Sequence, residues 1–119
     1  MNKNEEKSMA TVLPDGVTKE MLDGWKERYG QNKVKLVTLF HDEERAQSME
    51  VVARVPDRRT LADINKWLDK DPSKAMDIAV KACLLTQKEL VVADDDWYQS
   101  ACTAIVRMIP SREAEIKNL

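Results

Sequence analysis

From Asp71 to Gln87 the chain reads DPSKAMDIAVKACLLTQ. The apolar residues of this stretch extend almost all the way round a helix of 3.6 residues per turn and leave a thin polar stripe through Lys74, Asp77 and Lys81. A helix that is apolar on nearly every side has to be surrounded by other elements. We therefore predict a central helix over residues 71–87, with Pro72 at its first position, in the core of the fold.

The composition indicates one domain that folds in water. The chain has 119 residues, of which 43% are hydrophobic and 34% charged, enough apolar material for a core without metals or disulfides. No apolar run approaches the roughly 18 residues that a membrane span needs, so we expect a cytoplasmic protein and no membrane contact. The formal net charge of -2 lacks the positive field of a non-specific nucleic-acid binder, and nucleic acid is not an expected partner.

The N-terminal part of the chain predicts a tail followed by a helix. Residues 1–13 show no periodic apolar pattern and are expected to be a disordered tail, whereas residues 14–119 form a single α+β domain. Thr18 is placed to cap a helix that ends at Tyr29, before Gly30. The narrow apolar stripe that includes Trp25 and Tyr29 either caps the core or docks on a partner. Left exposed, the stripe would favour a homodimer.

Two alternating runs then predict an antiparallel hairpin. The first extends from Lys33 to Phe40 and the second from Met49 to Val55, each with the period of two that a strand requires. The connection lacks an Asn-Gly or Asp-Gly pair, so we expect a loop longer than two residues. Pro56 closes the second strand, and a helix of about three turns follows it, up to residue 70.

Beyond the central helix, residues 88–93 are expected to be an extended connector or a short third strand. Asp94, Asp95 and Asp96 should cap the last helix, which Pro110 kinks or restarts, and residues 111–119 should continue as a charged helix with a frayed end. The predicted fold class is α+β: a β-hairpin packed on a bundle of three to four helices in a single domain.

No constellation for catalysis is evident. His41 is the only histidine and is either a solvated loop residue or one half of an acid–base pair. The three aspartates at 94–96 fit helix capping better than a hard-cation site, which needs more converging oxygen ligands. Cys83 and Cys102 lie in apolar helical contexts and are expected to be buried free thiols. We therefore predict no enzyme activity, no catalytic residue, no metal and no cofactor.

The candidate binding residues surround Pro56 and the first helix. Arg54, Arg58 and Arg59 could recognise carboxylates or phosphates, or could form a solvated corner paired with Asp57 and Asp63. The residues that we predict to bind a partner are Trp25, Tyr29, Arg54, Arg58 and Arg59.

Four short stretches carry a family resemblance. They are RVPDRRTL at 54–61, DPSKA at 71–75, CLL at 83–85 and SREAEIK at 111–117. Together they resemble the small tail assembly chaperones encoded by phages and prophages. The resemblance implies a non-enzymatic protein that binds the tape measure protein, and tail tube proteins, before the tube polymerises. The alternative is a cytoplasmic adaptor, or a nucleic-acid-associated regulator that uses the arginine corner, of unknown target.

Overall fold

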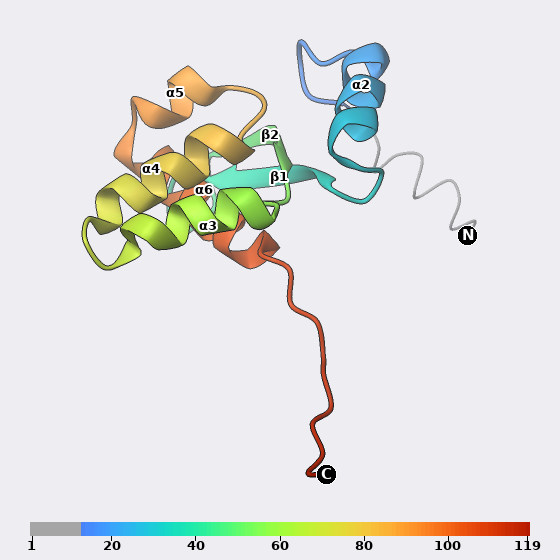
Figure 1. Cartoon of the computed structure of the whole chain (residues 1–119). Helices are drawn as coiled ribbons and strands as arrows, with labels where there is room; N and C mark the ends of the chain where they lie inside the picture. The colour runs from blue at the N-terminus through green and yellow to red at the C-terminus, as the bar shows by residue number, and fades with distance from the viewer. Residues whose placement is uncertain (1–12) are drawn as a thin grey trace.

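A two-stranded hairpin lies at the centre of the computed structural model, which describes residues 13–119 (Figure 1). Strand β1 (Val34–Phe40) pairs antiparallel with β2 (Ser48–Arg54), in a register that sets Val37 opposite Val51. The loop between the strands spans residues 41–47, which confirms the prediction of a long connection. The disordered tail predicted for residues 1–13 falls, apart from Leu13, outside the described residues.

Four helices pack with the hairpin: α3 (Arg58–Leu68), α4 (Pro72–Cys83), α5 (Lys88–Val92) and α6 (Asp95–Met108). The side chains of Asp57 and Asp71 accept hydrogen bonds from the N–H groups of Thr60 and Lys74, so each aspartate caps the start of a helix. Leu39, Val51, Val80 and Ile105 are among the core residues, each at most 2% exposed. The predicted α+β class, a hairpin on a helical bundle, is confirmed.

The central helix is shorter than predicted. α4 ends at Cys83 rather than Gln87, because Leu84 leaves the helical conformation and forms an antiparallel bridge with Ala53 of β2. The next two residues, Leu85 and Thr86, also bond to β2. The N–H of Leu85 donates to the oxygen of Val52 (2.8 Å), and the N–H of Val52 donates to Oγ1 of Thr86 (2.9 Å). Residues 84–86 therefore pair with β2 where we had expected the helix to continue.

Residues 88–93 are not extended, so that prediction was wrong. Residues Lys88–Val92 form the short helix α5. One helical turn directs only Val91 into the core, where it is fully buried, while Leu90 and Val92 remain 49% and 39% exposed. Three successive apolar residues suggested a strand, but burial of one residue in three fits a helical turn.

The predicted C-terminal helix at residues 111–119 is also absent. α6 ends at Met108, and after Pro110 the chain extends away from the helices without regular secondary structure (Figure 1). All side chains from Ser111 to Leu119 are exposed. A helix of this length is marginal in water without a surface to pack on, so good helix propensity alone does not maintain it.

Helix α2 (Lys19–Tyr29) lies beside the hairpin rather than in the bundle (Figure 1). Thr18 caps it through the N–H of Met21, and Gly30 follows its last residue with a positive φ of 114°, as the sequence predicted. No residue of α2 is fully buried. Among residues 13–119, none of the helices is long and apolar enough to cross a membrane.

Candidate functional site

A groove lies between the end of α2, the end of the hairpin and the first turns of α3. Its volume is about 710 Å³, and its wall is mostly apolar, with Tyr29, Val55, Pro56, Leu61 and Pro110 contributing. Arg28, Lys33, Arg54 and Arg58 also line it, and Asp57 is the one acidic residue among its described lining residues. An apolar groove with a basic rim suits a segment that carries both apolar and acidic side chains.

Arg54 is committed to holding the wall of this groove together. Its Nε donates to the carbonyl oxygen of Ala82 (2.9 Å), one of the free carbonyls at the end of α4, and an Nη donates to Oγ1 of Thr60 (3.2 Å). Its guanidinium also lies 4.9 Å from the centre of the Tyr29 ring. With its side chain only 13% exposed, Arg54 joins β2, α3, α4 and α2, and has little capacity left for a ligand.

The remaining predicted partner-binding residues are divided between the groove and the surface outside it. Tyr29 and Arg58 line the groove, whereas Trp25 and Arg59 are not among its lining residues. Arg28, Lys33 and Leu61 line it and were not singled out from the sequence. Arg28 adjoins the apolar stripe of α2, its guanidinium 5.3 Å from the Tyr29 ring, so the signal that could have identified it was its place beside a half-buried tyrosine.

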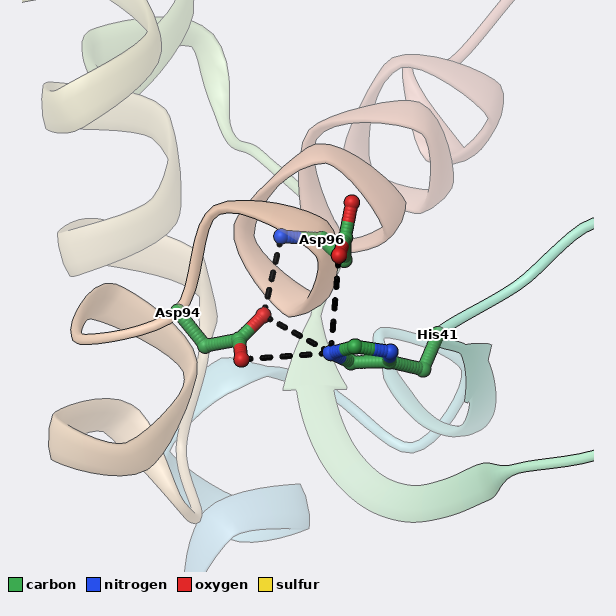
Figure 2. Close-up of side chains that lie close together, drawn as sticks. All are labelled: His41, Asp94 and Asp96. Carbon is green, nitrogen blue, oxygen red and sulfur yellow. Dashed lines mark hydrogen bonds and ion pairs between the residues drawn. The ribbon is translucent and has the colours of Figure 1, made fainter.

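A second cluster joins the end of β1 to the start of α6 (Figure 2). Nε2 of His41 lies 3.0 Å and 3.1 Å from the two carboxylate oxygens of Asp94, and 3.6 Å from an oxygen of Asp96. The ring of His41 also meets the edge of Trp97, with 4.8 Å between ring centres. His41 is therefore not a solvated loop residue, because Asp94, 53 positions along the chain, holds it in an ion pair.

Asp94 caps α6 as predicted and binds His41 with the same carboxylate. Its Oδ1 accepts hydrogen bonds from the N–H groups of Asp96 (2.9 Å) and Trp97 (3.1 Å). The Trp97 bond and the His41 contact lower the pKa of Asp94, and the hydrogen bond to Asp94 raises the pKa of His41. The two residues therefore favour each other's charged form.

The same three side chains are also the group that could best hold a metal ion among the described residues. One ligand atom from each of His41, Asp94 and Asp96 lies within 4.8 Å of the others. An ion here would replace the proton on Nε2 and compete with the helix cap for the oxygens of Asp94. The ion pair with His41 and the helix cap already give the carboxylate oxygens of Asp94 their partners. Our prediction of no metal site is therefore unchanged.

The two cysteines are free, as predicted, but only Cys83 is buried as we expected. Cys83 is fully buried and Cys102 half-buried. Burial raises the pKa of both thiols, and that of the neighbouring Tyr98 to about 12. A buried thiol with a raised pKa is a poor nucleophile. Both cysteines therefore contribute to packing rather than to chemistry.

Comparisons with known proteins give a fold neighbour and no function. No protein-family profile matches this chain, and a search of curated proteins finds no match. A solved structure of an uncharacterised protein from Bacillus stearothermophilus is similar, with 16% identity and a TM-score of 0.52. The match covers 81% of this chain and 99% of that one. At this level of identity the similarity concerns the fold alone.

Proposed function

We propose that this protein is a non-enzymatic assembly chaperone or adaptor whose clients are phage tail proteins, the tape measure protein first among them. The groove between α2 and α3 is the observation that carries the proposal, and it serves as the client site. Its apolar wall would cover an aggregation-prone segment, and the side chains of Arg28, Lys33 and Arg58 would pair with acidic residues of that segment.

The way α2 is attached supports this role. One wall of the groove is formed by the last turn of α2, through Arg28 and Tyr29, and no residue of α2 is fully buried in the rest of the protein. A helix with no fully buried residue can shift at low cost to enclose a client. Met21, 41% exposed, and the half-buried Trp25 then offer further apolar surface on the same helix.

The arginine corner gives less support to the alternative of a nucleic-acid-associated regulator. That reading needs three free guanidiniums, but Arg54 donates to Ala82 and Thr60 within the protein. The phage clients themselves are inferred from the resemblance of residues 54–61, 71–75, 83–85 and 111–117 to tail assembly chaperones. Such clients would be met in the cytoplasm, where tails are assembled.

Two neighbouring arginines of α3 provide a matched test. Arg58 lines the groove and Arg59 does not, although both are exposed and in the same helical turn. The protein should be co-expressed with the products of the genes adjacent to its own, among them any long tape-measure-like protein. We expect it to keep that protein in the soluble fraction and to co-purify with it.

We expect Arg58→Glu to weaken this binding about tenfold or more, because it reverses a charge at the rim, and Arg59→Glu to leave it nearly unchanged. Binding is measured by isothermal titration with the purified client segment. Failure of every neighbouring tail protein to co-purify would refute the proposed clients. An equal effect of the two variants would refute the groove as the binding site.

A further inference from the structure

Along β1, some backbone N–H and C=O groups form hydrogen bonds with β2 and others point away from it. The N–H of Val55 donates to the oxygen of Lys33 (2.7 Å), and at the other end of the hairpin the N–H of His41 donates to the oxygen of Gln47 (3.1 Å). In an antiparallel ladder the residues that bond to the partner strand alternate with residues whose backbone groups point away from it. Val34, Leu36 and Thr38 therefore direct their N–H and C=O groups away from β2.

Each edge of the hairpin is covered at one point only. On the outer edge of β2, Leu85 and Thr86 form hydrogen bonds with the C=O and N–H groups of Val52. Val52 therefore points away from β1, as the alternation along the ladder requires. On β2, no hydrogen bond within the described residues reaches the outward backbone groups of Ser48 or Glu50.

On the outer edge of β1, the N–H of Phe40 donates to Oγ of Ser100 (3.0 Å). Within residues 13–119, no hydrogen bond reaches the outward backbone groups of Leu36 or Thr38. Leu36, 43% exposed, adds an apolar side chain to this open edge.

We propose that the open edge of β1 binds β1 of a second copy of this chain, antiparallel and centred on Leu36. In this register Leu36 faces Leu36 of the second copy, and Val34 faces Thr38 of the second copy at both ends. Each hydrogen-bonded pair of an antiparallel ladder exchanges two bonds, so the three pairs form about six. The contact joins two hairpins into one four-stranded sheet and covers the exposed leucine.

The charges along β1 favour this partner and this direction. Basic residues stand at the start of the strand, and acidic residues gather where it ends. Four acidic residues line one hollow between the hairpin loop and α6, where they outnumber the two arginines, Arg45 and Arg107. The basic residues are Lys33 and Lys35, and the acidic residues are Asp42, Glu43, Asp95 and Asp96. Antiparallel pairing places the basic start of one strand beside the acidic end of the other, whereas parallel pairing would bring like charges together.

Apart from Lys33, which lines the client groove and also stands at the basic start of β1, the dimer contact is separate from that groove. None of Val34, Leu36 and Thr38 lines the groove between α2 and α3. Self-association therefore does not rest on the proposed chaperone function, and either can fail without the other.

Two lysine substitutions on the outer face of the hairpin test the contact with the full-length chain. Sedimentation equilibrium over a range of protein concentrations should show a monomer–dimer equilibrium for the wild type. Leu36→Lys sets two like charges face to face at the centre and should raise the dimer dissociation constant by about tenfold or more. Ser48→Lys adds the same charge at an exposed position of β2, away from this edge, and should leave the constant nearly unchanged.

Amide hydrogen exchange then reports whether β1 is the strand involved. The amides of Val37 and Leu39, bonded to β2, should be protected at every concentration, whereas those of Leu36 and Thr38 should become protected only as the dimer forms. A protein that remains monomeric with these two amides exchanging rapidly would overturn the proposal. Protection of Leu36 and Thr38 in a monomer would overturn it too, because a segment of the same chain would then occupy the edge.

Discussion

His41 and Asp94 show how two side chains can hold together elements that are distant in sequence. The ion pair joins the end of β1 to the cap of α6, over 53 positions of the chain. Because the pKa of His41 is raised above 6.5 in the folded protein, its proton adds stability below that pH, and this contribution is lost as the pH rises through the folded-state value. The lowered pKa of Asp94 has the opposite effect, since its contribution is lost as the pH falls below 3.8.

The titration of His41 should therefore depend on Asp94. In NMR spectra of the wild type, the His41 ring should titrate above 6.5. Asp94→Asn removes the charge but keeps a side chain that caps helices well, so the fold should persist and the midpoint should decrease. Asp95→Asn serves as the control, because Asp95 makes no hydrogen bond or ion pair with His41 among the described contacts. An unchanged midpoint in Asp94→Asn would show that the pair is not formed in solution.

At the scale of single residues, helix caps could be predicted and long-range partners could not. The roles of Thr18 and Asp94 as caps follow from residue type and position next to an apolar run, and each forms the expected bond. The pairing of His41 with Asp94 depends on how the end of β1 meets α6. Nothing local to His41 indicates this contact.

At the scale of elements, the predicted helix bounds were wrong where tertiary contacts outweigh the local sequence pattern. The apolar run that ends α4 predicted helix as far as residue 87, but the edge of β2 offered backbone partners to residues 84–86. Conversely, residues 111–119 have good helix propensity but no surface to pack on. The short helix α5 was also missed, because five residues are too few to show a helical period. The longer helices, the strands and their order were predictable, because a periodicity sustained over many residues is set by the face that becomes buried.

Arg54 joins four elements, and its removal should destabilise the protein. In Arg54→Met the buried Thr60 hydroxyl and the end of α4 each lose a partner, and hydrogen bonds to charged groups contribute roughly 1.5–3 kcal/mol each. We expect the free energy of unfolding in urea to decrease by about 2–3 kcal/mol. Arg58→Met, at an exposed position, should change it by less than about 0.5 kcal/mol. Equal stability of the two variants would contradict the structural role of Arg54.

At the scale of the whole molecule, the protein combines a packed body with a C-terminal segment that lies apart from it. Ile116 is 93% exposed, and none of residues 111–119 is buried. Ile116 and Leu119 are three residues apart, as on one face of a helix, but no other part of the protein packs against them. An exposed segment of this composition could become ordered on binding a partner, as the proposed function would require.

Deletion of residues 111–119 should separate stability from binding. The free energy of unfolding in urea should change by less than about 0.5 kcal/mol, because no buried contact is removed. Binding of the client segment should weaken if the C-terminal segment folds against it. A loss of stability above about 2 kcal/mol would instead show that the segment packs on the body in solution.

The covered point on the edge of β2 affects the stoichiometry of any association through the hairpin. Residues 84–86 occupy that edge at Val52, so in a sheet built from two hairpins each end strand would be blocked at this point. This block interrupts the run of free backbone groups that a third copy would need, which favours closed association over fibrils. A substitution that releases Thr86 from Val52, such as Thr86→Pro, would expose a second edge and put the protein at risk of open-ended polymerisation.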